Sequence, residues 1–263
     1  MAAAAVQIDV PAAGVQRIRL VNPTHRGALS EEVLDGLMGA LGTVPGDARC
    51  LLLASCGDSF SAGYDIRALG NPPDPDLAQR TIGPDRVELF DALEDQPLPV
   101  VVALNGPAFG GGLELALACD LRIAAASATL GAPAGKLGLV YSPGGLERLA
   151  RELPAGVLAE MFLAGETLSA ERAYRLGLVC QVVASEELES ESVALAARVA
   201  ELAPHSARAH RLALRALRAA AAPMGAEARA QLERARLAGL ASRDFAEGLT
   251  AFRERRAPRF SGA

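Results

Sequence analysis

The ten residues at positions 105–114, NGPAFGGGLE, are the stretch of the sequence that says most about the fold. They follow a continuous apolar run, VVVAL at positions 100–104, which predicts a buried β-strand. The apolar segment at positions 113–120 comes next, and it is typical of a helix. The order strand, glycine-rich loop, helix is therefore expected around the three glycines at positions 110–112.

Glycines in such a loop let the backbone approach a ligand closely, or they serve only to make turns. A helix that begins at Gly111 or Gly112 directs its first N–H groups at whatever lies in front of it. Glu114 falls in the opening turn of this otherwise apolar helix. It is either a charged partner for the helix dipole or a general acid or base.

A second glycine-containing loop, SFSAGYD at positions 59–65, follows another apolar run, CLLLA at positions 50–54. Two backbone N–H groups presented by such loops would form an oxyanion hole. The sequence thus contains two strand-to-loop junctions at which backbone donors are expected to face a ligand.

The rest of the chain repeats the same alternation of strand and helix patterns. Strands are expected at 15–21, 121–125 and 178–183, and helices after a Ser30 cap and at 86–94. The proline-rich stretch 71–84 is expected to be mobile, and 129–145 is again rich in Gly and Pro. Amphipathic helices are expected at 157–163, 170–176, 187–202 and 207–217. The alternation predicts an α/β class, with a sheet-containing core at residues 1–195 and a helical region at 196–263.

Composition excludes several classes of protein. The chain has 263 residues, of which 51% are hydrophobic, and no apolar stretch is long enough to span a bilayer. A net charge of -5 argues against a general nucleic-acid surface, and the N-terminus lacks the pattern of a secretory signal, so a cytoplasmic protein is expected. The four cysteines are expected to be reduced, and the three histidines do not cluster, so no metal site is expected. The GxSxG, HExxH, GxGxxG and GKS/GKT motifs are absent.

Four sequence segments resemble the crotonase (enoyl-CoA hydratase/isomerase) superfamily and occur in the same order, and together the resemblance extends over almost the whole chain. They are SFSAGYDIRAL, PLPVVVALNGPAFGGGLELALACDLRIAAASATLGAP, AGETLSAERAYRLGLVCQVV and DFAEGLTAFRERRAPRF. The resemblance implies a spiral of ββα repeats, a C-terminal helical trimerisation region, and a homotrimer or dimer of trimers. It also implies an acyl-CoA substrate, with CoA as part of that substrate and no separate cofactor, whose enolate is held by two backbone N–H groups.

Carried onto this sequence, the resemblance assigns the two enolate donors to the N–H groups of Tyr64 and Gly111. One such donor contributes about 10² to 10³ in rate. The resemblance also places residues beside CoA, with the last reaching the CoA of a neighbouring subunit: Arg26, Ala28, Ala62, Asp65, Ile66 and Arg255.

The sequence departs from the hydratases of this family at position 134. Hydratases use a second carboxylate there besides the one at Glu114, and this chain has Ala134. Tyr141, at a position where hydratases generally have proline, resembles the methylmalonyl-CoA decarboxylase branch. A tyrosine hydroxyl in a site can orient a carboxylate or donate a proton, and it can equally be a packing group. Decarboxylation of a methylmalonyl-CoA-like substrate is therefore expected.

Three questions stay open on sequence alone. An ionised Glu114 would repel a substrate carboxylate, so Glu114 is turned away, is protonated through burial, or meets a different substrate. Lys136, the single lysine, is either a counter-charge to the substrate or solvent-facing. The alternative functions are an enoyl-CoA hydratase or isomerase working through Glu114, and a CoA- or RNA-binding family member with little catalysis.

Overall fold

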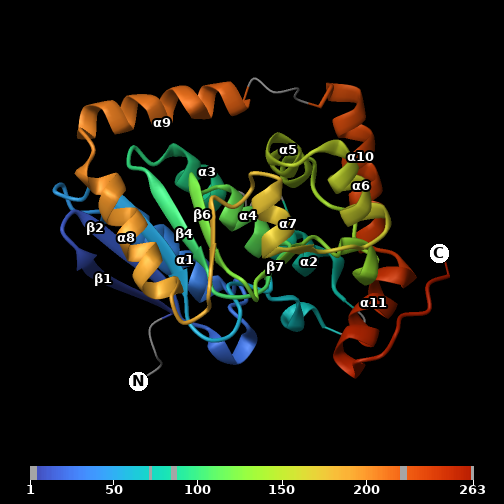
Figure 1. The fold of residues 1–263 in the computed structure, drawn as a ribbon. Helices are drawn as coiled ribbons and strands as arrows, with labels where there is room; N and C mark the ends of the chain where they lie inside the picture. The colour runs from blue at the N-terminus through green and yellow to red at the C-terminus, as the bar shows by residue number, and fades with distance from the viewer. Residues whose placement is uncertain (1–4, 71–72, 84–87, 220–223, 262–263) are drawn as a thin grey trace.

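A six-stranded sheet lies at the centre of the fold in the computed structural model, which describes residues 5–70, 73–83, 88–219 and 224–261. The strand order is β1-β2-β3-β4-β6-β9, with β1 antiparallel to β2 and every later pair parallel. The strands are β1 (Val6–Ala12), β2 (Val15–Leu20), β3 (Cys50–Ser55), β4 (Val100–Leu104), β6 (Leu121–Ala125) and β9 (Gln181–Val183). Parallel strands need connections that cross a face of the sheet, and helices supply most of them here (Figure 1).

The central strands β3 and β4 are buried on both faces, which is why they are continuous apolar runs without alternation. Successive side chains of a strand point to opposite faces, so each strand contributes to two separate cores. Leu52 and Val101 pack beneath α8 (Leu188–Glu201), whereas Leu53 and Val102 belong to the larger core that contains α1 (Glu31–Gly42) and α3 (Glu88–Asp95). The sheet is therefore the middle layer between α8 and the helices that carry the site.

A smaller sheet and a group of short helices lie on the larger-core side. The sheet contains β5 (Ala108–Phe109), β7 (Thr129–Gly131) and β8 (Leu168–Ser169). The helices are α4 (Gly111–Leu117), the 3₁₀ turn η4 (Ala134–Leu137), α5 (Pro143–Glu152), α6 (Ala155–Leu163) and α7 (Ala170–Arg175). Because α4 is buried at every position and packs against α5, its first residues have a fixed place in the fold.

The C-terminal helices cover this half of the molecule. The helix α9 (Pro204–Ala219) crosses from α8 towards α10 (Ala226–Leu240), and the first half of α11 (Arg243–Glu254) packs against η4 (Figure 1). The buried Arg211 holds α9 to the body by donating to Asp120 Oδ2 at 2.7 Å and to the carbonyls of Leu93 and Glu94. The C-terminal helices thus complete the chain's own core as well as its surface.

The α/β class and the helical C-terminal region are confirmed. The expectation of a mobile stretch at 71–84 is wrong for its described middle part, because Pro75–Ile82 forms the helix α2. Asp74 caps this helix, accepting from the N–H groups of Asp76 and Leu77, and Pro75 occupies its first turn, where proline is well tolerated. Residues 86 and 87 of the predicted helix 86–94 lie outside the described residues, and the observed helix is α3.

Besides α2, the elements not anticipated from the sequence include the edge strand β1, the three short strands of the smaller sheet, and the helix α5 within and after the glycine-rich segment 129–145. No helix in the described part of the chain is long and apolar enough to cross a membrane.

Candidate active site

A mostly apolar cavity of about 120 Å³ lies where the two glycine-rich loops meet the η4 segment and α10. Its polar lining comes from a few side chains, among them Glu114, Tyr141 and Ser142, set among apolar groups such as Ile66 and Leu139. An apolar pocket with a few convergent polar groups is the usual form of a small-molecule site. The residues lining the cavity are Ala62, Gly63, Tyr64, Ile66, Ile82, Gly83, Phe109, Gly110, Gly111, Glu114, Pro133, Ala134, Leu137, Leu139, Val140, Tyr141, Ser142, Arg236 and Leu240.

Backbone hydrogen bonds join the two glycine-rich loops. The N–H groups of Phe60 and Ser61 donate to the carbonyl of Pro107 at 3.0 and 3.1 Å, and Phe109 N–H donates to the carbonyl of Ser61 at 2.9 Å. Gly63 has φ +90°, a backbone conformation that side-chain-bearing residues rarely adopt. A Cβ placed on Gly63 would lie 3.2 Å from the Gly111 nitrogen, so the loops touch at this point.

The predicted oxyanion donors, Tyr64 and Gly111, therefore lie side by side on one wall of the cavity. Gly111 is the first residue of α4, so its N–H has no carbonyl partner within the helix. A Cβ on Gly111 would approach Cε2 of the Tyr64 ring to 2.9 Å, which shows how closely the two residues pack. Both residues line the cavity, and their role as enolate donors stays a prediction.

Glu114 lies within the first turn of α4, only 5% exposed, and lines the cavity. Burial raises the pKa of its carboxyl above the usual 4.5, while the Tyr141 hydroxyl and the Arg148 charge oppose that shift. Of the options left open by the sequence, burial that favours the protonated acid agrees with this position. The Arg148 charge favours the ionised form instead, and its Nη1 lies 3.6 Å from Glu114 Oε2.

The Tyr141 hydroxyl is buried beside Glu114 and has no hydrogen-bond partner of normal geometry among the described residues. Burial, reinforced by the nearby Glu114 charge, raises the pKa of Tyr141 well above 10, so the hydroxyl keeps its proton. Its ring packs edge-on against Phe162, with centroids 5.1 Å apart. Leaving a buried hydroxyl unpaired is costly, so this atom is a good candidate to bind a ligand.

Gly145 in α5 separates the side chains of these two residues. A Cβ at this position would lie 2.9 Å from Glu114 Oε2 and 2.8 Å from Tyr141 Cε1. Ser142 caps the same helix, accepting from Gly145 N–H at 3.1 Å. The start of α5 thus fixes how closely the carboxyl and the hydroxyl approach each other.

Comparison with known proteins agrees with this geometry. The sequence profile of the enoyl-CoA hydratase/isomerase family matches residues 11–263. A probable enoyl-CoA hydratase from Bacillus subtilis (strain 168) is 36% identical over 244 residues, covering 89% of this chain and 91% of the relative. The chain belongs to the enoyl-CoA hydratase/isomerase family.

Other family members are equally similar in sequence or structure. A carnitinyl-CoA dehydratase from Salmonella typhi is 36% identical, with 82% of both chains covered. A structure described as methylmalonyl-CoA decarboxylase complexed with 2S-carboxypropyl CoA superposes with a TM-score of 0.87 at 28% identity over the whole of both chains. Another, described as methylmalonyl-CoA decarboxylase in complex with 2-nitronate-propionyl-CoA, has a TM-score of 0.86 at 29% identity and 98% coverage of both. The crotonase fold predicted from sequence is confirmed.

Five of the residues predicted to contact CoA in this family lie on two segments that a backbone hydrogen bond joins, and two of them, Ala62 and Ile66, line the cavity. Ala62 N–H donates to the carbonyl of Arg26 at 2.9 Å, which joins the loop of Arg26 and Ala28 to the loop that carries Asp65 and Ile66. Asp65 caps the following 3₁₀ turn by accepting from Arg67 N–H at 3.1 Å. Their contact with CoA stays a prediction.

The sixth predicted residue, Arg255, is exposed at the C-terminal end of α11, at φ +55°. It was assigned to the CoA of a neighbouring subunit, and that assignment also stays a prediction.

The structure also gives the positions of Ala134 and Lys136 relative to the cavity. Ala134 is buried and lines the cavity, so the position of the second carboxylate is filled by a methyl group. Lys136 is exposed and does not line the cavity; its stem lies over Gly165. The solvent-facing alternative for Lys136 therefore agrees with the structure.

Sequence reasoning missed two arginines, Arg148 and Arg236, that the fold brings to the site. Arg148 comes from α5 and faces Glu114. Arg236 comes from α10, is 2% exposed, and donates to Gln79 Oε1 and to the Glu233 carboxylate at 2.6 Å each. Neither belongs to a motif, and only the packing of α5 and α10 against the loops reveals them.

Proposed function

We propose that the protein decarboxylates a short acyl-CoA that carries a carboxylate on the α-carbon, of the methylmalonyl-CoA kind. The observation that carries the proposal is the unpartnered, buried hydroxyl of Tyr141 beside Glu114, in a cavity that has Ala134 in place of a second carboxylate. Hydration requires one group to deprotonate water and another to protonate carbon. Decarboxylation requires no base to start it.

The proposed reaction begins when the bond between the α-carbon and the substrate carboxylate breaks. CO₂ leaves, and the two electrons of the broken bond form the thioester enolate. The N–H groups of Tyr64 and Gly111 stabilise the charge on the thioester oxygen. The Tyr141 hydroxyl orients the leaving carboxylate, and the protonated Glu114 then donates a proton to the α-carbon. Glu114 regains its proton from water, so each turnover consumes one proton and releases one CO₂.

The protonation of Glu114 removes the conflict seen in the sequence. A carboxylic acid in the cavity does not repel a substrate carboxylate, and burial raises the pKa of Glu114 towards that state. The acid form dominates below the raised pKa and is lost as the pH rises through it. The proposal therefore requires that the Glu114 carboxyl be buried, as it is in the structure.

The size of the cavity favours a small acyl group. Its volume of about 120 Å³ is less than the roughly 300–1,000 Å³ of pockets that enclose larger ligands. Two of the methylmalonyl-CoA decarboxylase structures that superpose on this chain hold ligands with short acyl groups, named as carboxypropyl and 2-nitronate-propionyl CoA. That likeness supports the proposed substrate class.

Hydration or dehydration of an enoyl-CoA is the second candidate. The presence of Glu114 and the names of the 36% identical relatives, a probable enoyl-CoA hydratase and a carnitinyl-CoA dehydratase, favour it. Glu114 is, however, the only carboxylate among the described residues that line the cavity, so it would have to carry out both proton transfers.

The test offers methylmalonyl-CoA and crotonyl-CoA separately to the purified protein. We expect CO₂ release from the first, and a fall of about 10² in its rate in Tyr141→Phe, the lower end of the range for a proton-handling group. Tyr174→Phe, at a half-exposed tyrosine on α7, is the matched control and should leave the rate unchanged. Rapid hydration of crotonyl-CoA without CO₂ release from methylmalonyl-CoA would overturn the proposal in favour of the second candidate.

We further propose that the chain assembles as a homotrimer or a dimer of trimers, as the family resemblance implies. The exposed leucines of α9, Leu212, Leu214 and Leu217, support an interface on this helix, since each is more than half exposed. Sedimentation equilibrium gives the mass directly, and a monomer at micromolar concentration would contradict the proposal.

A further inference from the structure

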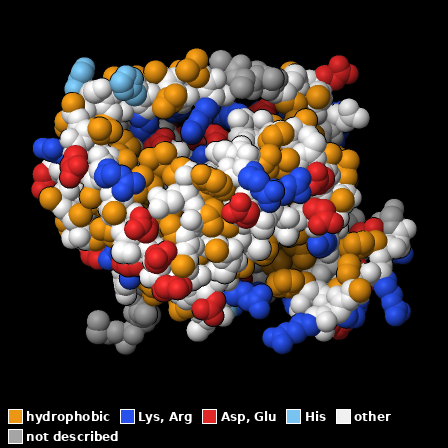
Figure 2. All heavy atoms as spheres, in the orientation of Figure 1, with side chains coloured by type: hydrophobic (Ala, Val, Ile, Leu, Met, Phe, Trp, Pro, Cys, Tyr) orange, Lys and Arg blue, Asp and Glu red, His pale blue; other side chains and the backbone are white. Residues whose placement is uncertain are grey.

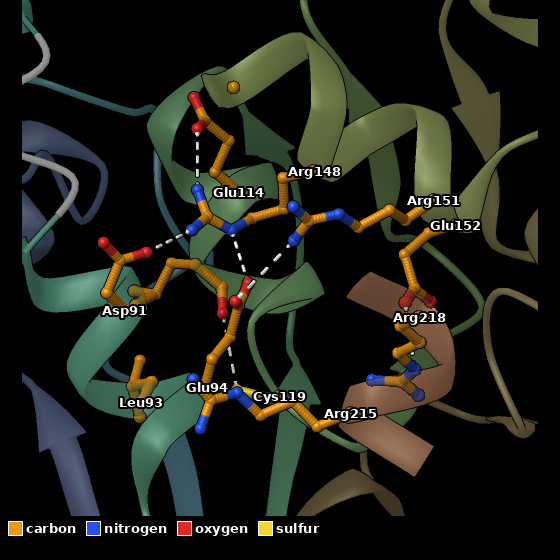
Figure 3. Close-up of polar contacts among 12 residues, drawn as sticks. Asp91, Leu93, Glu94, Glu114, Cys119, Arg148, Arg151, Glu152, Arg215 and Arg218 are labelled. Atoms are coloured by element: carbon orange, nitrogen blue, oxygen red, sulfur yellow. Dashed lines mark hydrogen bonds and ion pairs between the residues drawn. The ribbon is translucent and has the colours of Figure 1, made fainter. Parts of the chain in front are cut away.

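The Arg148 guanidinium faces three carboxylates with three different nitrogens. Its Nε donates to Glu94 Oε1 at 2.7 Å, and its Nη2 donates to Asp91 Oδ1 at 2.9 Å. Its Nη1 lies 3.6 Å from Glu114 Oε2 (Figure 3). One arginine of α5 therefore connects two carboxylates of α3 to the carboxyl of α4 that lines the active-site cavity.

The three contacts differ in kind. The two outer contacts have the distances of charge-assisted hydrogen bonds, whereas the inner one is too long for such a bond. Nη1 is buried and makes no hydrogen bond of normal geometry among the described residues, so charge dominates its interaction with Glu114. The guanidinium also stacks on the Phe90 ring, 5.1 Å from its centroid, and is only 6% exposed. Arg148 thus cannot swing towards Glu114 without losing its outer contacts.

We propose that Arg148 is a positioning residue for the acid at Glu114: Asp91, Glu94 and Phe90 hold it so that its charge acts on Glu114 without bonding to it. This inference rests on the proposed catalytic role of Glu114. A direct hydrogen bond would keep Glu114 as a carboxylate turned towards α5. A charge held at 3.6 Å stabilises the carboxylate that remains after proton donation, yet leaves both carboxyl oxygens free to exchange a proton.

Two opposing influences therefore meet at Glu114. Burial raises the pKa of the carboxyl, and the Arg148 charge and the Tyr141 hydroxyl lower it. The charged groups that face Arg148 in turn are Asp91 and Glu94 of α3, which offset part of its charge. Removing Arg148 should raise the pKa of Glu114 further, and removing the charge of Glu94 should lower it.

The sign of these two responses separates a positioning role from a structural one. Loss of packing or stability has no reason to move the titration of Glu114 in opposite directions for two residues that bond to each other. Arg151 offers a matched control, because it lies one turn further along α5 and approaches the same Glu94, with Nη1 3.9 Å from Oε2 (Figure 3). It makes no ion pair with Glu114 among the contacts of the described residues.

The experiment titrates Glu114 by infrared spectroscopy in the full-length protein. The carbonyl band of its protonated carboxyl is assigned by its disappearance in Glu114→Gln. We expect the midpoint to rise by about one pH unit or more in Arg148→Met, as is typical for losing an opposite charge at this range. We expect it to fall in Glu94→Gln and to stay unchanged in Arg151→Met.

The double variant Arg148→Met/Glu94→Gln keeps the test decisive if Arg148→Met does not fold, because it leaves no uncompensated charge at Glu94. Its midpoint should also lie above that of the wild type. An unmoved midpoint in both Arg148 variants, or an equal shift in Arg151→Met, would overturn the inference. The readout needs no substrate, so a protein that shows these shifts but releases no CO₂ refutes the proposed reaction and not the role of Arg148.

Discussion

Arg148 lines one cavity and faces Glu114, which lines another, and the two cavities are lined by opposite kinds of side chain. On one side is the mostly apolar active-site cavity, whose only carboxylate among the described lining residues is Glu114. On the other is a cavity of about 390 Å³ beneath α9, lined by six arginines and five acidic residues. Figure 2 shows basic and acidic side chains close together just below α9.

The charges of the polar cavity are matched with one another. Arg211 pairs with Asp120 at 2.7 Å, Arg218 with Glu152 at 3.3 Å, and Arg229 with Glu147. In the active-site cavity the buried Tyr141 hydroxyl makes no hydrogen bond of normal geometry among the described residues. The number of charged groups therefore does not mark the reactive site. A buried polar group that lines an apolar cavity without such a bond, as Tyr141 does, marks it better.

The largest effect is expected from a substitution in the predicted oxyanion hole of the active-site cavity. Gly111→Pro removes one N–H donor while keeping a residue type that suits the first turn of a helix. Turnover should fall by about 10² to 10³. The matched control is Gly111→Ala, which adds a Cβ at the same place against the Tyr64 ring but keeps the N–H. Equal rates in the two folded variants would exclude Gly111 as a donor.

A change on the polar side should affect stability and leave turnover nearly unchanged. Arg211→Met removes the hydrogen bonds that Arg211 donates to Asp120 and to the carbonyls of Leu93 and Glu94, and Asp120 Oδ2 keeps only its bond from Val100 N–H. The free energy of unfolding should fall by roughly 2–4 kcal/mol, measured by urea denaturation. Arg215→Met, at a pair whose side chains are about half exposed, should cost less than about 1 kcal/mol. A large loss of kcat in folded Arg211→Met would show that the polar cavity contributes to catalysis as well as to stability.

The smallest effect contrasts two adjacent glycines of α5, since Gly145 packs against Glu114 and Tyr141 whereas Gly144 lines the polar cavity. Gly145→Ala places a methyl group 2.9 Å from Glu114 Oε2, so kcat should fall about tenfold, or ~1.4 kcal/mol in barrier height. Gly144 lines the polar cavity, and a Cβ there meets nothing within 4 Å. Gly144→Ala should therefore stabilise the helix by about 0.5–1 kcal/mol with an unchanged rate. Similar kcat values for the two variants would contradict the close packing of Glu114 and Tyr141.

Much of the fold could be predicted because its strands and helices carry their own patterns. Continuous apolar runs predicted β3 and β4, and the predicted helices at 170–176 and 187–202 correspond to α7 and α8 within one residue at each end. The helix α2 was missed because its prolines were interpreted as breakers. Pro75 lies in the first turn, directly after the capping Asp74, where proline starts a helix instead of ending one.

The site was predictable only where its residues are backbone donors or part of a motif. Gly111, Glu114 and Tyr64 lie on the two loops that the sequence singled out, and the structure brings these loops together. Arg148 and Arg236 could not be inferred, because an arginine in an amphipathic helix is usually a surface charge. Only the packing of α5 beside α3 and α4 shows that Arg148 faces Glu114.

The pH dependence of CO₂ release tests the central claim, that the buried Glu114 acts as the protonated acid of a decarboxylase. Burial raises the folded-state pKa of Glu114 above 4.5, so the active acid form is present below that raised value and is lost as the pH rises through it. We predict a kcat for methylmalonyl-CoA that declines with one ionisation above pH 4.5, and Glu114→Gln should lack this decline. A kcat that increases through the same ionisation would show that Glu114 works as a base, and would contradict the account.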